Sequence, residues 1–262
     1  MTYKEPAKSV VDVGDGAAIP TKGDRGLFTA WRFAFFGAIF ALGYLVASKP
    51  DPYYNIVKFI PDGIVVTFKV TVGAIILALI IGLFTGLGRI SSNRFINGIA
   101  SLYVEVIRGI PLLVQIFYIY YALGRFVKIP DLLSAIIAMA VCYGAYMGEV
   151  IRAGIQSIPK GQMEAALSLG MNRWQALRHV ILPQALKVVL PPVGNEFIAL
   201  LKDSSLVSIL AVADLLRRGR EFASESFTYF ETYTVIALVY LIITLFFSKL
   251  IGIMEERINE NS

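Results

Sequence analysis

Long apolar runs dominate this sequence, and each is long enough to cross a lipid bilayer. A helix that spans the hydrocarbon core needs about 20 mostly apolar residues. Six stretches approach or exceed that length: Leu27–Ala47, Gly63–Gly88, Ile99–Leu123, Leu132–Ala153, Val188–Ala213 and Thr234–Ile253. They predict an all-α integral membrane protein with about six transmembrane helices.

The composition agrees with membrane residence and excludes other classes. Of the 262 residues, 56% are hydrophobic and 16% are charged, whereas soluble domains carry about 25% charged residues. The net charge of +5 fits basic cytoplasmic loops, and we expect no nucleic-acid partner because no Lys/Arg-rich block is present. A single cysteine, Cys142, and a single histidine, His179, leave little for metal binding or catalysis, so we predict neither a metal site nor an enzyme.

The placement of Lys and Arg predicts the orientation. Residues 1–26 are polar, with Gly, Pro and both charge signs, and are typical of a flexible cytoplasmic tail. With the N-terminus inside, this tail and the loops after the second and fourth spans hold most of the basic residues. We therefore predict both termini in the cytoplasm. Three arginines oppose this assignment because they fall outside, beside Glu221, Glu225 and Glu231: Arg217, Arg218 and Arg220.

The polar stretch from Gly154 to Lys187 has the pattern of two short helices. Ser157 and Pro159 suit the start of the first helix, and Gly170 suits its end in a left-handed conformation. Asn172 followed by Gln175 predicts the capped start of a second helix, which Pro183 should end or bend. Such a hairpin either lies on the membrane or docks into a soluble partner, and its shape alone does not choose between the two.

The fifth span is the best candidate for a substrate path. A charge at membrane depth costs about 2.5–3.5 kcal/mol on insertion scales and normally faces a cavity or a partner. Pro191 and Pro192 should break this span, and broken spans often mark transport sites. The candidate residues are Asn195, Glu196, Lys202, Asp203 and Ser204, together with Glu149 of the fourth span.

Structural roles for these charges stay open as alternatives. Lys202 and Asp203 could neutralise each other between helices, and Glu149 could form a structural pair with Arg152. Gly82 and Gly86, spaced as in Gly-x3-Gly, could pack two helices closely, although in a glycine-rich span they are weak evidence for dimerisation.

One motif carries a resemblance to a known family. The pattern E-A-A-x3-G-x9-V-x-L-P resembles the EAA loop of permeases in ATP-binding cassette importers, which usually have Ile at the Val position. Its residues are Glu164, Ala165, Ala166, Gly170, Val180, Leu182 and Pro183. The flanks Gly148–Met171 and Leu190–Leu210 are similar to the polar amino acid branch. The resemblance covers residues 59–256, which it identifies as a type I importer transmembrane domain with its EAA loop at about 157–187, so the span at residues 27–47 is an addition.

The resemblance implies the partners and the energy source. The EAA loop would dock an ATPase subunit through Glu164, Ala165, Ala166, Gly170, Leu182 and Pro183. This sequence has no G-x-x-x-x-G-K-S/T phosphate loop, so ATP and Mg would bind that separate ATPase and this chain would carry no cofactor. A second permease copy or paralogue, an extracytoplasmic amino-acid-binding protein and the bacterial cytoplasmic (inner) membrane complete the expectation.

Other functions compete with an importer permease for amino acids. The main alternative is a secondary transporter or channel for small solutes that is not driven by ATP. It would explain the charged, Pro-containing span but not a two-helix loop. A membrane enzyme and a membrane scaffold are weaker rivals.

Overall fold

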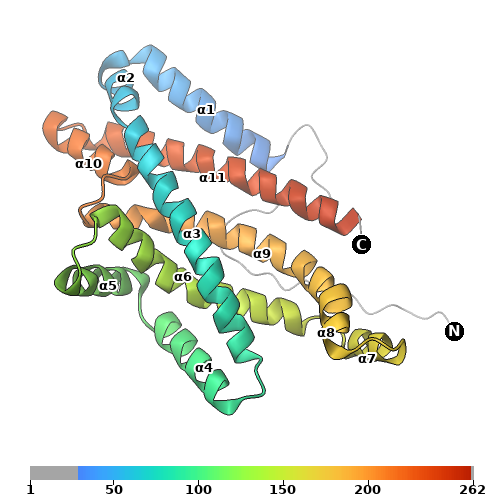
Figure 1. Cartoon of the computed structure of the whole chain (residues 1–262). Helices are drawn as coiled ribbons and strands as arrows, with labels where there is room; N and C mark the ends of the chain where they lie inside the picture. The colour runs from blue at the N-terminus through green and yellow to red at the C-terminus, as the bar shows by residue number, and fades with distance from the viewer. Residues whose placement is uncertain (1–28, 261–262) are drawn as a thin grey trace.

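The computed structural model describes residues 29–260, and all regular elements in this range are helical (Figure 1). The predicted tail, 1–26, lies outside the described residues. The long helices are α1 (Ala30–Ser48), α3 (Pro61–Arg89), α6 (Asp131–Gln156), α9 (Leu182–Asp203) and α11 (Tyr229–Glu260). The shorter helices are α2 (Pro50–Phe59), α4 (Arg94–Gly109), α5 (Leu112–Phe126), α7 (Lys160–Ser168), α8 (Arg173–Ala176) and α10 (Leu215–Ser226).

Four helices of the described range are long and apolar enough to cross a membrane: α1, α3, α6 and α11. The bent pair α4–α5 makes a fifth if it counts as one span. Helix α9, with Lys187, Glu196, Lys202 and Asp203 along its length, is not among them. The predicted all-α membrane fold is therefore confirmed, whereas the count of six spans and the orientation of the termini stay predictions.

The third predicted span, Ile99–Leu123, is wrong as a single helix. Helix α4 ends at Gly109, and α5 leaves it at 112° after Ile110, which is extended. The physical cause is Pro111, because a residue that precedes proline is pushed out of the helical region. The Gln115 amide donates to the carbonyls of Ile107 and Ile110, both at 2.5 Å, and so satisfies acceptors that the break would leave free.

The break predicted in the fifth span at Pro191 and Pro192 is also wrong. Helix α9 runs through both prolines without interruption, because the fixed φ of proline is compatible with a helix even though its missing N–H removes a hydrogen bond. Packing supports the continuous helix: Gly194 faces Ile251 of α11 so closely that a Cβ would meet that side chain at 2.9 Å. The regular α-helix ends instead at Asp203, where a 3-10 helix, Ser204–Ile209, begins.

The most extensive contact in the described structure joins α3 and α6. Glycines allow it: a Cβ on Gly82 would overlap the Cβ of Met147, and a Cβ on Gly86 would meet the Gly148 carbonyl oxygen at 2.8 Å. From the other helix, a Cβ on Gly144 would meet the Ile81 side chain at 2.6 Å. The Gly82-x3-Gly86 motif therefore packs two helices within this chain.

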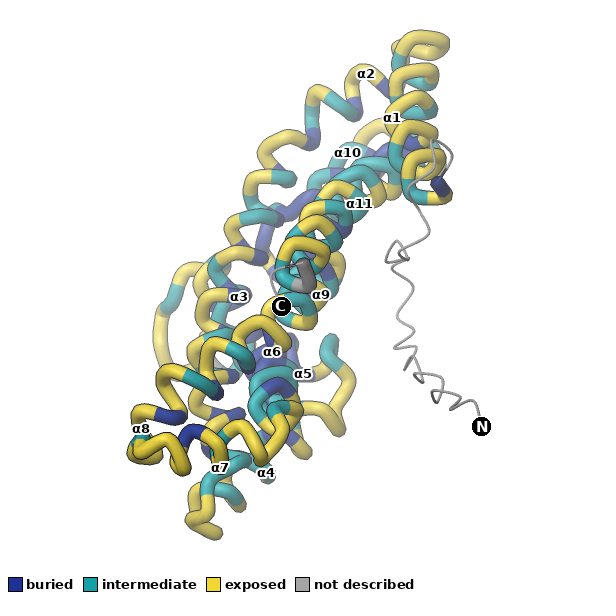
Figure 2. The backbone as a smooth tube through the Cα atoms, turned by 90° about the vertical axis from the view of Figure 1, so that its right-hand side faces the viewer, coloured by how far each residue is buried: buried dark blue, intermediate teal, exposed yellow. Residues whose placement is uncertain are grey.

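Two apolar clusters hold the remaining helices. The larger is built around α3 and α6 with residues from α5, α9 and the 3-10 helix, and includes Met139, Leu200 and Val207. The smaller joins α2, α10 and α11 through Ile56, Leu215 and other residues, with α1 packed at its edge. Helix α1 is exposed along most of its length (Figure 2). It is tied to α11 by a 2.9 Å hydrogen bond from the Trp31 indole to the Leu245 carbonyl.

Helices α2 and α10 lie at the end of the molecule opposite α7 and α8 (Figure 1). Two of the arginines that opposed the predicted orientation are paired at this end. Arg217 bonds Glu221 at 3.0 Å, and Arg218 bonds both Asp62, at 2.5 Å, and Glu221, at 2.9 Å. These ion pairs give both arginines a structural role at this end, and the orientation of the termini stays a prediction.

The glycine contact between α3 and α6 predicts the effect of adding one methyl group. We expect Gly82→Ala to lower the free energy of unfolding by roughly 1–3 kcal/mol, because the closely packed helices must separate. Gly98→Ala is the matched control: a Cβ there meets nothing within 4 Å, and alanine favours a helix interior. Thermal melting of the purified chain in detergent measures both, and equal melting temperatures would contradict the packing role.

Candidate functional site

The loop between α6 and α9 folds as the two short helices that its sequence predicts. Helix α7 ends in a glycine turn in which Gly170 N–H donates to the Leu167 carbonyl and Met171 N–H donates to the Ala166 carbonyl. Helix α8 starts with a reciprocal capping box between Asn172 and Gln175, both bonds at 2.9 Å. The corner between the helices is therefore fixed by four hydrogen bonds rather than by a free linker.

Gly170 is required at this corner by its backbone conformation. Its φ of +84° lies in the left-handed region that side chains rarely adopt. A Cβ at this position would meet nothing within 4 Å in this chain, so internal packing does not demand a glycine. The open space beside the corner is therefore available to another molecule.

The two ends of the loop are attached differently. Helix α6 extends to Gln156, and Ser157–Pro159 connect it to α7, so Ser157 ends one helix rather than starting the next. After α8 the chain passes through a π-helical turn, Leu177–Ile181, directly into α9. Of the end or bend predicted at Pro183, an end is wrong, because Pro183 lies in the first turn of α9, where its missing N–H is tolerated.

Predicted docking residues and two further apolar side chains lie exposed around the corner. Glu164, Ala165, Leu182 and Pro183 are exposed, whereas Ala166 is buried. Leu169 and Trp174, on either side of Gly170, are 80% and 69% exposed, and sequence reasoning missed them. The sequence contains a pattern that could have indicated them, because both are large apolar residues beside a glycine turn in a polar loop. Exposed apolar groups outside a membrane span mark a contact surface.

The polar residues of α9 are brought to α6 by a tyrosine that sequence reasoning also missed. The Tyr143 hydroxyl donates to the Asp203 carboxylate at 2.7 Å, and Glu196 lies seven residues before Asp203 in α9. Tyr143 itself is buried in the larger cluster. The i, i+7 spacing of Glu196 and Asp203 predicts their common face, but nothing local in the sequence indicates Tyr143, 60 positions away from Asp203.

The other predicted path residues of α9 are distributed between its surface and its core. Asn195 and Lys202 are exposed, and among the ion pairs of the described residues there is none between Lys202 and Asp203. Ser204 is fully buried, and its hydroxyl donates to the Leu201 carbonyl at 2.7 Å. The Ser204 hydroxyl is therefore already bonded to the last turn of α9.

Glu149 is held by three arginines from three helices. Its carboxylate lies 2.6 Å from Arg89 of α3, 3.0 Å from Arg152 of α6 and 3.8 Å from Arg108 of α4. The Arg108 guanidinium also lies 5.5 Å from the ring centre of Tyr146. With its acceptor sites taken by guanidinium groups, Glu149 fits the structural pairing with Arg152 better than a place on a substrate path.

Comparison with known proteins shows which family the chain belongs to. The family model described as "Binding-protein-dependent transport system inner membrane component" matches residues 67–260. The glutamine transport system permease protein GlnP of Escherichia coli is 38% identical over 199 residues, which are 75% of this chain and 91% of that protein. The L-cystine transport system permease protein TcyB of Bacillus subtilis is 41% identical over 199 residues, which are 75% of this chain and 85% of that protein.

Solved structures agree with the sequence comparison. A crystal structure of an amino acid ABC transporter with histidines contains a chain that is 44% identical, with a TM-score of 0.74, and the match covers 78% of this chain and 96% of the other. The methionine ABC transporter MetNI, in an inward-facing conformation, shares the fold at 19% identity with a TM-score of 0.65, covering 79% and 98%. Helix α1 and helix α2 lie outside the region that the family model matches.

The three arginines around Glu149 predict that removing its charge lowers the stability of the fold. We expect Glu149→Gln to lower the free energy of unfolding by about 1–3 kcal/mol, because it leaves partly buried guanidinium groups without their counter-charge. Arg89→Gln in the same chain should restore part of the loss. Glu164→Gln is the control, since that exposed carboxylate takes part in none of the ion pairs of the described residues. Thermal melting of the unchanged chain, the two single variants Glu149→Gln and Arg89→Gln, their double variant and the control measures the effect, and additive losses would contradict a shared cluster.

Proposed function

Because the chain belongs to the family of binding-protein-dependent transport system inner membrane components, we propose that it is the permease subunit of an ATP-driven importer of amino acids. The observation that carries the proposal is the agreement among its relatives. Permeases named for glutamine and for L-cystine are 38% and 41% identical, and a chain from an amino acid ABC transporter is 44% identical. The chain is accordingly a transport subunit rather than an enzyme.

The α7–α8 corner supports the proposal that a separate ATPase subunit supplies the energy for transport. An ATPase subunit, with its ATP and Mg, would receive the exposed surface made by Glu164, Leu169 and Trp174 around Gly170. The capping box and the glycine turn fix this surface, so a force applied there moves it as a unit rather than distorting it. The missing phosphate loop in the sequence agrees with hydrolysis on a separate subunit.

The cluster of Tyr143, Glu196 and Asp203 supports a site for the substrate's ammonium group. The Tyr143 hydroxyl and the Asp203 carboxylate meet between α6 and α9, and Glu196 lies two turns earlier on the same face of α9. Every amino acid carries a cationic ammonium group, and carboxylates are its natural hydrogen-bond acceptors. Exposed Asn195 and Lys202 on the same helix offer partners for the substrate carboxylate.

The remaining partners follow from surfaces that this chain leaves open. Asn195 and Lys202 are polar groups at membrane depth, where contact with lipid is costly, so a second permease copy or paralogue is the partner that would cover them. An extracytoplasmic amino-acid-binding protein would meet the α2–α10 end, opposite the ATPase. The chain would lie in the bacterial cytoplasmic (inner) membrane with α7 and α8 on the cytoplasmic side.

ATP dependence of transport separates this proposal from a secondary transporter or channel. Proteoliposomes that contain the chain, its ATPase and its binding protein should accumulate a labelled amino acid only when ATP is present. Uptake that persists without ATP and follows an ion gradient would show instead that the chain is a secondary transporter or channel.

Gly170→Asp tests the docking surface. The aspartate is strained at φ +84° and projects a charge into the open space beside the corner, so we expect it to abolish co-purification with the ATPase. Gly161→Asp is a matched control, because it adds the same charge to α7 at a position of ordinary φ that is also open. Recovery of an intact complex from Gly170→Asp would count against the assignment.

The acidic cluster predicts a transport defect without a docking defect. Glu196→Gln and Asp203→Asn should each reduce uptake roughly 10-fold to 100-fold, the range expected for a lost charge-assisted hydrogen bond. Tyr143→Phe should reduce it less. Uptake into proteoliposomes measures the defect, co-purified ATPase shows intact docking, and the exposed Glu256→Gln is the control substitution. Normal uptake by both carboxyl variants would remove these residues from the path.

A further inference from the structure

The turn between α10 and α11 displays a large aromatic side chain in a backbone conformation that does not suit it. Phe227 ends α10 with a φ of +57°, in the left-handed region, where a Cβ is crowded and glycine is not. Its side chain is 83% exposed, so packing within this chain does not account for a phenylalanine. Hydroxyl groups hold the turn, since Ser226 Oγ lies 2.6 Å from Thr228 Oγ1. The strained aromatic residue therefore points to a contact outside the chain.

The exposed surface of the chain changes from polar to apolar at this turn. The exposed residues in the second half of α10 are polar: Arg220, Ser224, Glu225 and Ser226. The exposed residues at the start of α11 are aromatic: Tyr229, Phe230 and Tyr233. Helix α11 is one of the helices long and apolar enough to cross a membrane, whereas α10 is not among them. The turn therefore marks the place where the surface passes from water to lipid.

The length of α11 places the turn at the edge of the hydrocarbon core. Residues 234–253 make about 30 Å of helix, which is the thickness of that core. Phe230, 78% exposed, lies four residues before this stretch and so about 6 Å further out. The interfacial layer extends about 5–7 Å beyond the core on each side. Phe230 therefore falls within the interfacial layer, and Phe227 borders it.

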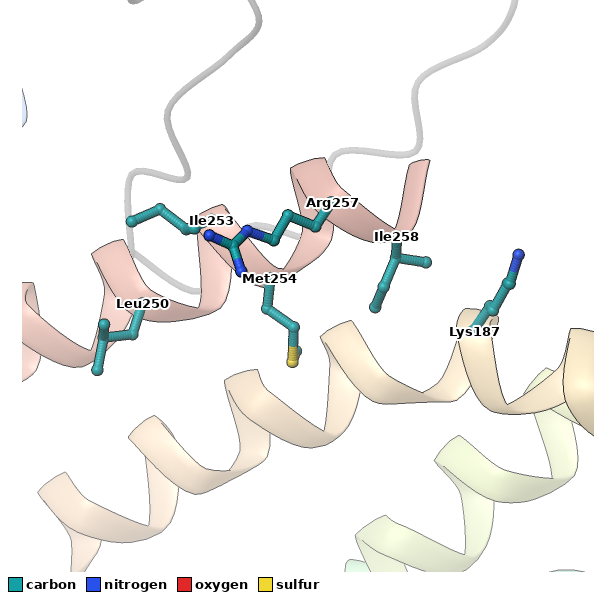
Figure 3. A pocket seen from close by; sticks show the side chains of 6 residues that line it. All are labelled: Lys187, Leu250, Ile253, Met254, Arg257 and Ile258. Atoms are coloured by element: carbon teal, nitrogen blue, oxygen red, sulfur yellow. The ribbon is translucent and has the colours of Figure 1, made fainter. Parts of the chain in front are cut away.

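The other end of α11 shows the opposite boundary of the same span. Apolar side chains continue through Leu250 and Met254, which line a groove against α9 (Figure 3). Three charged residues then follow one another: Glu255, Glu256 and Arg257. The apolar part of α11 is thus bounded at both ends, which fixes the depth of the aromatic turn without reference to the orientation of the termini.

We propose that the α10–α11 turn is an aromatic anchor that inserts Phe227 and Phe230 into the interfacial layer of the bilayer at the α2–α10 end of the molecule. Aromatic side chains are enriched in this layer. A protein that docks from water would meet the charged surface of α10, whereas Phe230 continues into the exposed apolar surface of α11. The inference rests on the membrane fold and not on the transported substrate.

The anchor would set the level of α10 relative to the lipid. The start of α10 is tied to α3 by the 2.5 Å ion pair between Arg218 and Asp62. An anchor at its other end would hold the whole helix along the membrane surface and keep Glu225 in water. The end of the molecule opposite α7 and α8 would then have a fixed position in the bilayer (Figure 1).

Tryptophan fluorescence of the full chain in phosphatidylcholine liposomes tests the depth of the turn. Trp31→Phe with Trp174→Phe removes both native tryptophans, and Phe230→Trp then places one reporter in the turn. We expect lipids brominated near the headgroup end of their acyl chains to quench it more than lipids brominated near the chain ends. Aqueous iodide should quench it weakly. If the background variants do not fold, Phe230→Trp is read as the difference from the unchanged chain.

Two further reporters calibrate this measurement. Glu225→Trp, on the exposed polar surface of α10, should be quenched by iodide and not by brominated lipid. Leu241→Trp, exposed within α11, should be quenched most by bromine near the chain ends.

A variant pair then asks whether the two aromatic side chains set the depth. Phe227→Gly with Phe230→Ser removes both rings, and glycine suits the φ of +57°. A Tyr233→Trp reporter should lose part of its quenching by shallow bromine and gain quenching by iodide. Ser224→Ala with Glu225→Ser is the matched pair on the polar side and should leave that reporter unchanged.

Two results would overturn the proposal. Iodide quenching of Phe230→Trp as strong as that of Glu225→Trp would place the turn in water and make it a surface for a protein partner. A Tyr233→Trp reporter that does not move when both rings are removed would show that the aromatic side chains do not anchor the turn.

Discussion

The close contact between α3 and α6 is the interaction on which the other parts of the structure depend. Glycines on both helices bring the backbones together, and dispersion contacts accumulate along the whole interface. This contact sets the position of Arg89 beside Glu149, and it fixes α6 as the surface on which α9 packs. Tyr143 of α6 in turn reaches Asp203 of α9 across the direct contact between those two helices.

Features that depend on neighbours in sequence could be predicted, whereas features that depend on distant neighbours could not. The turn at Gly170 and the capping box at Asn172 follow from bonds within a few residues, and both are confirmed. The continuity of α9 through Pro191 depends on packing against α11, which the local pattern does not contain. Tyr143 was missed for the same reason, because its role comes from a residue in another helix.

Charge counts and glycine motifs likewise identify the residues that interact but not the residues that they contact. Arg217 and Arg218 opposed the predicted orientation as bare charges, but the folded chain gives them Glu221 and Asp62 as partners. The motif at Gly82 and Gly86 predicted close packing of two helices without naming the second one, which is α6 of the same chain. In both cases the residue types were informative, and only the identity of their partners required the structure.

The unequal attachment of the α7–α8 corner has a mechanical consequence. On the α6 side, Ser157–Pro159 form a non-helical joint, whereas on the other side helical hydrogen bonding continues through the π-helical turn into α9. A joint absorbs rotation, but a continuous helix transmits it along its axis. Displacement of the corner would therefore turn or shift α9 while α6 stays in place on α3. A load on the corner would therefore pass to α9 through helical hydrogen bonds and to α6 only through the three connecting residues.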